Sequence, residues 1–279
     1  MAIDYEAEYN NRARVPEHVE IFARWRRAAE DYRVEAMQER RAELGLMYGS
    51  SSRQFIDLFS PRPEVTAPLA LFIHGGYWRS LEPSLFSHMA RGLNAHGVAV
   101  AVVGYDLCPE VTIAEIIDQI RHACLFLWLR TSQRMMVYGH SAGGHLAGAM
   151  VATDWQSRYP KAPPDLVPAA YSISGLFDLT PLLHTTMTQD LRFDEAEARR
   201  ISPLFWPAPQ DRAFDAVVGA LESSEFLRQS RIITDAWGEA GARTRYEAVG
   251  GTNHFTVIDA LPDPDSAMVA RLAELARAQ

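Results

Sequence analysis

The sequence predicts an α/β fold with a mostly parallel central sheet of about eight strands and helices on both faces. Short apolar runs, typical of buried parallel strands, alternate along the chain with longer segments of helical periodicity. A repeated order of strand, helix and strand places the helices over both faces of one sheet. The 279 residues contain no repeat and no long Gly/Ser-rich linker, so we expect a single domain over residues 1–279.

The first 42 residues predict an N-terminal arm that is mainly helical. Pro16 stands where a helix would begin, and Phe22, Trp25 and Tyr32 follow at helical spacing. We therefore expect an amphipathic helix whose apolar stripe packs on the rest of the domain.

The expected strands are short, mostly apolar segments. They span residues 44–49, 54–59, 69–74, 98–103, 135–140, 169–174, 215–220 and 244–249. The expected helices beyond the arm span residues 85–95, 113–129, 145–152, 226–238 and 267–278. Residues 181–210 break this alternation, because the segment is longer than one crossover requires and carries Phe205 and Trp206 among prolines. We expect this insert to form a small cap over a site.

The composition restricts the classes of partner. The chain has 27 basic and 35 acidic residues, a formal charge of -8, which does not favour nucleic acid or an anionic membrane. The start of the chain lacks a signal-peptide pattern, and no apolar run approaches the roughly 20 residues that span a bilayer. Cys108 and Cys124 lack metal-binding or disulfide-framework spacing. We expect a cytoplasmic protein without metal or cofactor; the sequence does not report the oligomeric state, and a homodimer is compatible with it.

A nucleophile motif lies where an expected strand ends and an expected helix begins. Gly139, His140, Ser141, Ala142 and Gly143 form a G-x-S-x-G pentapeptide. The turn of such an elbow is tight, so glycines on either side leave room that a Cβ would fill. Its serine stands at a helix N-terminus, where free N–H groups favour developing negative charge. Ser141 is therefore the candidate nucleophile. The alternative is a glycine-rich helix start at which the serine is only a cap, because it would have the same sequence pattern.

A second glycine motif follows the strand at residues 69–74. His74, Gly75, Gly76, Tyr77 and Trp78 form the sequence HGGYW. An oxyanion needs at least two preorganised donors, and glycines let backbone N–H groups approach it closely. We predict an oxyanion hole in this loop, at Gly75, Gly76 and Tyr77, completed by the N–H of Ala142. The alternative is an ordinary turn after a strand.

The general base is expected on a loop after the last strand. His254, in GGTNHF, is the histidine at such a position. The remaining histidines fall on expected helices, in the insert or beside the two motifs, where a structural role is usual. No HExxH or comparable spacing indicates a metal site.

The acid that orients the imidazole should follow the strand at residues 215–220. Glu222 comes first, and Glu225 competes with it three residues later. Glu225 could also act in a capping box at a helix that starts at Ser223 or Ser224. Strand-end position favours Glu222.

Several aromatic and histidine side chains are candidates for substrate binding. Tyr77, Trp78, Phe205 and Trp206 could wall an aromatic pocket, with the N-terminal arm beside them. His74 and His140 flank the two glycine motifs and are further candidates. Ordinary core packing is the alternative for each of them.

Together these motifs resemble the arylformamidase, or kynurenine formamidase-like, branch of the α/β hydrolases. The resemblance covers most of the chain. Its motifs are Tyr9 to Arg12 with Pro16, HGGYW at 74–78, Tyr105 to Pro109, GHSAGGHLA at 139–147, SGLFDL at 174–179, Ser202 with Pro203, ESSEFLRQS at 222–230 and NHF at 253–255.

The resemblance implies the α/β-hydrolase fold and hydrolysis of an N-formyl or short N-acyl arylamide, or of a small aryl ester. It implies that the HGG-x-W loop carries the oxyanion hole and that Glu222 stands at the position of the acid. That position is usually aspartate in the family, so glutamate here is a departure.

Three function classes follow from the sequence. The first is an arylformamidase or aryl-acylamidase acting through an acyl-enzyme, and the second is a carboxylesterase or thioesterase with the same residues. The third, a binding protein that retains only the fold, has no need of a strained elbow, so the intact Ser141 and His254 weigh against it. The expected partner is a small aryl amide or ester.

Overall fold

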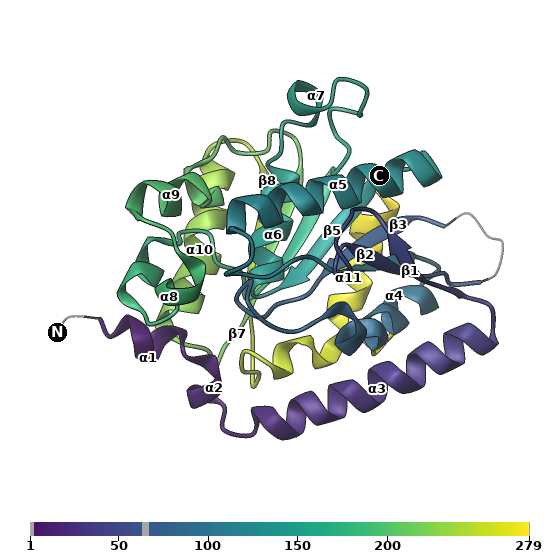
Figure 1. The fold of residues 1–279 in the computed structure, drawn as a ribbon, viewed down its shortest axis with the longest axis horizontal. Coiled ribbons are helices and arrows are strands. Elements are labelled where there is room, and N and C mark those ends of the chain that lie inside the picture. The colour runs from purple at the N-terminus through teal and green to yellow at the C-terminus, as the bar shows by residue number, and fades with distance from the viewer. Residues whose placement is uncertain (1–2, 63–66, 279) are drawn as a thin grey trace.

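Eight strands form one sheet in the order β1-β2-β4-β3-β5-β6-β7-β8 in the computed structural model (Figure 1). The structure describes residues 3–62 and 67–278; residues 1–2, 63–66 and 279, which the expected domain includes, lie outside this description. β2 is antiparallel to both β1 and β4, and all other pairs are parallel. The strands are β1 (Ala42–Met47), β2 (Phe55–Phe59), β3 (Leu69–Ile73), β4 (Ala99–Val103), β5 (Met135–His140), β6 (Ala169–Ile173), β7 (Ala213–Gly219) and β8 (Arg243–Val249). The predicted architecture is confirmed.

Helices follow the strands in the predicted order. The α-helices are α1 (Tyr5–Tyr9), α2 (Asn11–Arg14), α3 (His18–Gln38), α4 (Arg91–Ala95), α5 (Ile113–Thr131), α6 (Ala142–Val151), α7 (Trp155–Arg158), α8 (Thr188–Leu191), α9 (Glu195–Arg200), α10 (Ser224–Glu239) and α11 (Ala267–Arg277). The 3₁₀ helices are η1 (Pro83–Ala90), η2 (Thr180–His184), η3 (Pro203–Phe205) and η4 (Thr256–Ala260). The helix expected over 85–95 therefore starts as a 3₁₀ helix and continues as α4.

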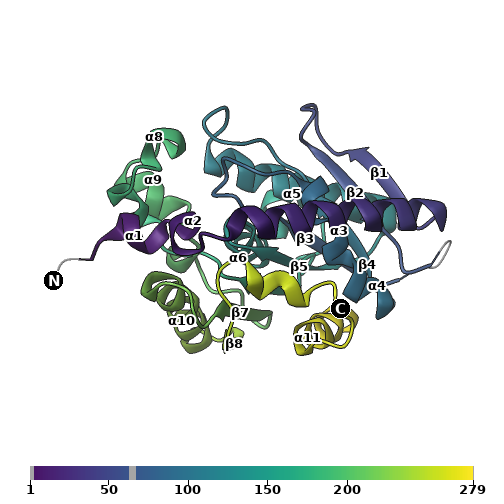
Figure 2. The same cartoon turned by 90° about the horizontal axis from the view of Figure 1, so that it is seen from below.

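Two apolar clusters lie on the two faces of the sheet. One contains the buried side chains of α5, α6 and α10, and the other those of α3, η1 and α11. Figure 2 shows the long helix α3 running across the molecule from α2 toward β1. Every residue of β3, β4 and β5 is buried, as expected for parallel strands covered on both faces. Because helices cover both faces of the sheet, the loops that follow the strands lie at its carboxyl edge.

The N-terminal arm is three helices instead of one. Helix α3 packs on η1 through the predicted apolar stripe, with Trp25 and Tyr32 buried. Before it, Asp4 caps α1 and Asn10 caps α2 by accepting a backbone N–H with the side chain, because Asp and Asn satisfy the free donors of a helix start. These breaks let α1 turn toward α10 and η2.

The insert at 181–210 carries most of η2, then α8, α9 and η3.

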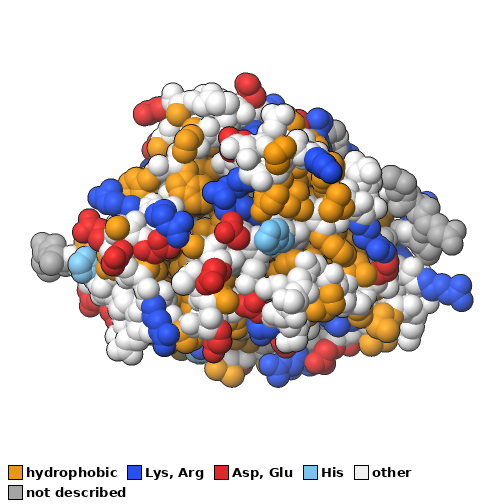
Figure 3. Space-filling model, turned by 45° about the horizontal axis from the view of Figure 1, so that its top comes forward, with side chains coloured by type: hydrophobic (Ala, Val, Ile, Leu, Met, Phe, Trp, Pro, Cys, Tyr) orange, Lys and Arg blue, Asp and Glu red, His pale blue; other side chains and the backbone are white. Residues whose placement is uncertain are grey.

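Within the described residues, no helix is both long enough and apolar enough to span a membrane. On the face shown in Figure 3, acidic and basic side chains are interspersed among hydrophobic ones, as the mixed composition leads one to expect.

Candidate active site

Four loops meet at the carboxyl edge of the sheet, where ligands bind in open α/β sheets. The loop after β3 carries Gly76 and Tyr77, and β5 runs directly into Ser141. Glu222 follows β7 and His254 follows β8. Residues far apart in the sequence thus share one region because their strands are neighbours or near neighbours in the sheet.

The Ser141 backbone has the conformation of a sharp elbow. Its φ is 57° and its ψ is -118°, a region that residues with a Cβ rarely adopt. A Cβ on Gly143 would lie 1.9 Å from the carbonyl oxygen of Ile73, and one on Gly139 would lie 2.2 Å from that of Gly143. The two glycines of the pentapeptide are therefore required by close backbone approach.

The loop after β3 passes directly over this elbow. A Cβ on Gly75 would lie 3.0 Å from the Cβ of Ser141. Gly76 has a φ of 113° and Tyr77 a φ of 50°, so the loop turns sharply at both residues. The backbone N–H groups of Gly76 and Tyr77 have no protein acceptor among the described residues, and that of Ala142 is at the first position of α6. These three N–H groups are free to bind an oxyanion.

Glu222 holds the ring of His254. Its Oε2 lies 2.6 Å from His254 Nδ1, with both side chains buried. Its other oxygen, Oε1, accepts hydrogen bonds from the Ser174 hydroxyl at 2.5 Å and from the Gly219 N–H at 2.7 Å. Because a carboxylate oxygen accepts, His254 donates its Nδ1–H to Oε2. The Nε2 atom of the neutral ring then carries no proton and can act as an acceptor.

Glu225 belongs to a different cluster. Helix α10 begins at Ser224 with Ser223 as its N-cap, so Glu225 falls in the first helical turn. Its carboxylate forms a bidentate pair with Arg228 and accepts a hydrogen bond from the Tyr9 hydroxyl at 2.8 Å. Of the two candidate acids, Glu222 is the one that contacts the imidazole.

His140 anchors the loop that carries His254. Its Nε2 donates to the carbonyl oxygen of His254 at 2.7 Å. Burial and the neighbouring His254 hold the pKa of His140 well below its usual value, so His140 stays neutral there. Asn253 turns the same loop, because its side chain accepts the N–H groups of Phe255 and Thr256.

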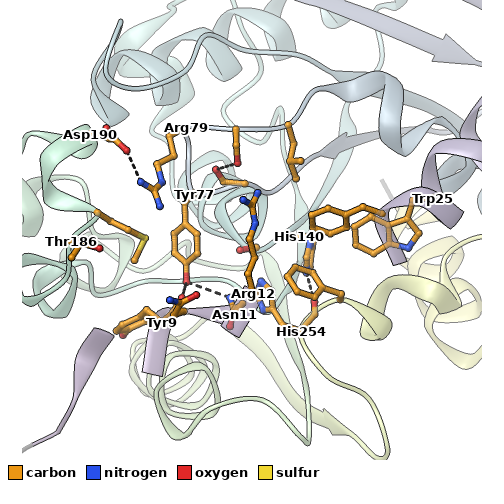
Figure 4. Close-up of a pocket in the computed structure, with 18 of the residues that line it drawn as sticks. Tyr9, Asn11, Arg12, Trp25, Tyr77, Arg79, His140, Thr186, Asp190 and His254 are labelled. Atoms are coloured by element: carbon orange, nitrogen blue, oxygen red, sulfur yellow. Dashed lines mark hydrogen bonds and ion pairs between the residues drawn. The ribbon is translucent and has the colours of Figure 1, made fainter. Parts of the chain in front are cut away.

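Ser141 and His254 line one cavity of about 440 Å³. Among the described residues, the Ser141 hydroxyl and the His254 ring form no direct hydrogen bond. The distance between a nucleophile and its base is often long in a free enzyme and shortens when substrate binds. Figure 4 shows His140 and His254 side by side at this cavity, with Arg12 between them and Tyr77.

Apart from the Ser141 elbow, the His254 loop and Phe86 of η1, the cavity walls come from three parts of the chain. The loop after β3 supplies Gly76 and Tyr77, and the insert supplies Met187 and Asp190. The N-terminal arm contributes more residues than either of these: Glu6, Tyr9, Asn10, Asn11, Arg12, Phe22 and Trp25. The sequence placed the N-terminal arm beside the pocket but named none of its individual residues as site residues. The signals for these residues were the motif from Tyr9 to Arg12 and the apolar helical stripe that follows it.

Four of the predicted substrate-binding residues do not line this cavity. His74 is fully buried and stacks on Tyr105 at 4.3 Å, and burial lowers its pKa to about 3. Trp78 is also fully buried and packs edge-on against His145. The prediction for these two residues is corrected, because apolar packing on the sheet outweighed their place in the motif.

The prediction that Phe205 and Trp206 bind substrate is also corrected. Phe205 lies under the guanidinium of Arg199, and Trp206 donates its indole N–H to the Arg200 carbonyl. Both contacts are with helix α9 of the same insert, so the aromatic pair stabilises the insert itself. Met187 and Asp190 are the part of the insert that reaches the cavity. Of the predicted substrate-binding residues, Tyr77 and His140 do line it.

Comparison with known proteins agrees with this architecture. A family model for the alpha/beta hydrolase fold matches residues 70–256. The chain belongs to the α/β-hydrolase family. This hydrolase is 33% identical over 232 residues to the kynurenine formamidase of Salmo salar, covering 80% of this chain and 78% of that protein. It is 31% identical over 238 residues to the kynurenine formamidase of Danio rerio, covering 82% and 80%. The arylformamidase-like resemblance is confirmed.

Solved structures of hydrolases are also similar. A proposed thioesterase from Silicibacter sp. TM1040 superposes with a TM-score of 0.83 at 36% identity, covering 96% of this hydrolase and 98% of that chain. An esterase of Pyrobaculum calidifontis has a TM-score of 0.71 at 18% identity, covering 92% and 91%. The second likeness concerns the fold alone.

Proposed function

We propose that this hydrolase cleaves N-formyl or short N-acyl arylamides through an acyl-enzyme on Ser141. The observation that carries the proposal is the strained Ser141 in the same cavity as His254, whose ring is held by the buried Glu222. The relation to the kynurenine formamidases supports the arylformamide as the substrate class. The aromatic side chains Phe22, Trp25 and Phe255 on the cavity wall support an aryl leaving group.

In the first half-reaction His254 Nε2 takes the proton of the Ser141 hydroxyl, and the oxygen attacks the carbonyl carbon. The N–H groups of Gly76, Tyr77 and Ala142 bind the oxyanion. The carbon–nitrogen bond then breaks, and His254 gives its proton to the leaving amine. In the second half-reaction His254 removes a proton from water, the hydroxide oxygen attacks the acyl carbon, and the carboxylic acid leaves as Ser141 recovers its proton.

A carboxylesterase or thioesterase activity is the second candidate. It needs the same residues, because an alcohol or thiol can replace the amine as leaving group, and the similarity to the proposed thioesterase favours it. A protein that only binds its ligand has no use for a backbone strained at Ser141.

The test compares kcat/KM for N-formylkynurenine with kcat/KM for phenyl acetate in wild type and Ser141→Ala. We expect the formamide to be preferred, and the variant to lose roughly 10³-fold or more on both substrates. Ser172→Ala is the control, since this buried serine lies outside the cavity and its hydroxyl has no partner among the described residues. A strong preference for phenyl acetate would favour the esterase, and an active Ser141→Ala would overturn the nucleophile.

A further inference from the structure

The charged side chains on the cavity wall are paired, with one exception. Arg79 forms an ion pair with Asp190, and both residues line the cavity (Figure 4). Glu6 accepts hydrogen bonds from the backbone N–H and the hydroxyl of Thr186. Arg12 lines the same cavity, and among the described residues it has no carboxylate within ion-pair distance. One positive charge at the cavity is therefore left for a ligand.

Arg12 is held close to the reacting groups by its own helix. Asn10 caps α2 through the N–H of Ala13, and the side-chain amide of Asn11 donates to the Tyr77 hydroxyl at 3.3 Å. The Tyr77 hydroxyl in turn donates to the Tyr9 carbonyl at 2.6 Å. Figure 4 shows the Arg12 side chain across the pocket between Tyr77 and His140. These contacts hold helix α2, which carries Arg12, against the predicted oxyanion loop.

An aromatic surface lies beside this charge. The guanidinium carbon of Arg12 is 6.0 Å from the ring centroid of Phe22. Phe22 in turn packs edge-on against Phe255, at 5.1 Å between ring centroids, and stacks on Trp25 at 5.2 Å. Phe255 follows His254 in sequence. An aryl group resting on these rings while its acyl carbon meets Ser141 would carry its substituents toward Arg12.

We propose that Arg12 determines specificity by binding a carboxylate on the leaving group of the substrate. A guanidinium presents a planar set of donors that matches a carboxylate, and such charge-assisted bonds are stronger than neutral ones. The class of substrate is an aryl amide or ester whose leaving group carries both the ring and an anionic substituent. This inference rests on the proposed hydrolysis at Ser141. It adds Arg12 to the substrate-binding residues and a negative charge to the expected substrate.

The test uses two esters of nearly the same shape, the anionic 3-acetoxybenzoate and the neutral 3-acetoxybenzamide. The measured quantity is the ratio of kcat/KM for the anionic ester to kcat/KM for the neutral one. We expect this ratio to fall about tenfold in Arg12→Gln, because an exposed charged hydrogen bond lies at the low end of its range. Arg12→Lys should retain part of the preference, and added salt should reduce the wild-type ratio.

The matched control is Arg14→Gln. Arg14 is an exposed arginine on the same short helix and does not line the cavity, so its loss should leave the ratio unchanged. An equal ratio in wild type and Arg12→Gln overturns the inference while the hydrolase activity stands, and so does an equal loss in Arg14→Gln.

A binding measurement separates this inference from the proposed function. Ser141→Ala protein is titrated with 3-acetoxybenzoate by calorimetry, with and without Arg12→Gln. We expect the dissociation constant to rise about tenfold when Arg12 is replaced. If wild type cleaves neither N-formylkynurenine nor these esters, the proposed function fails. This titration still decides whether Arg12 binds the carboxylate, because an unchanged dissociation constant would reject that binding.

Discussion

At the scale of single residues, Glu222 and Glu225 show how position decides the task of one side-chain type. Both follow β7 within three residues of each other and both are buried. Glu222 lies before helix α10 begins and faces His254, whereas Glu225 lies on the helix and is neutralised by Arg228. The carboxylate that meets an imidazole can stabilise its charged form during catalysis, and the carboxylate that meets a guanidinium cannot.

The two glutamates give a paired prediction. Glu222→Gln should lower kcat about 10²-fold to 10⁴-fold, because an amide cannot stabilise the imidazolium and permits the wrong tautomer. Glu225→Gln should leave kcat within about threefold and lower the free energy of unfolding by about 1 to 3 kcal/mol, since Arg228 and the Tyr9 hydroxyl lose a charged partner. Turnover and urea unfolding of both variants measure this, and a larger kcat loss in Glu225→Gln would reverse the assignment.

At the scale of elements, the N-terminal arm is part of the site. The Tyr77 hydroxyl donates to Tyr9 of α1 and accepts from Asn11 of α2. The Tyr9 hydroxyl is fixed by Glu225 and Gln229 of α10. The loop after β3, which we propose as the oxyanion loop, is therefore connected through α1 to the helix that follows Glu222, and we infer that the arm positions the loop.

The corresponding prediction concerns Tyr77→Phe. Loss of the hydroxyl removes both bonds to the arm while the ring still fits, so the N–H of Tyr77 should be less well positioned. We expect kcat to fall about threefold to thirtyfold with a smaller change in KM, because an oxyanion donor acts in the transition state. Tyr5→Phe is the control, since the Tyr5 hydroxyl makes no hydrogen bond within the described residues. Equal kcat values for wild type and Tyr77→Phe would refute the positioning role.

At the scale of the whole molecule, burial keeps several histidines neutral. Burial lowers the pKa of His88 and of His145 to about 4, and that of His74 to about 3. One ring nitrogen of each has no hydrogen-bond partner among the described residues, so protonation would add an unpaired buried donor. Between pH 6.5, the usual histidine value, and about pH 4, the unfolded chain binds more protons at these sites than the native one.

Stability should therefore fall as the pH drops through this window. The free energy of unfolding from urea titration should decrease from pH 7 to pH 5, with each such histidine contributing on the order of 1 to 2 kcal/mol. His88→Gln should flatten the pH dependence, because glutamine does not titrate and His88 lies outside the catalytic cavity. The same slope in wild type and variant would contradict the explanation.

Local physics accounts for what the sequence alone determined. The apolar runs predict the eight strands, because buried parallel strands need continuous apolar residues. The elbow at Ser141 and the loop at Gly76 could be located because only glycine tolerates the backbone contacts at 139, 143 and 76. The order of the motifs along the chain then brings His254 to the same edge of the sheet.

Only the tertiary structure decided which acid contacts His254 and which side chains form the cavity. Strand-end position favours Glu222 over Glu225 but does not exclude Glu225, and the Tyr9 contact that separates their roles spans 216 positions in the sequence. Arg12, Phe22 and Trp25 reach the cavity because capped breaks turn the arm across the edge of the sheet, whereas Trp78 and Phe205 pack elsewhere. Contacts between distant segments leave no periodic pattern in the sequence, so they are set by how the helices pack on the sheet.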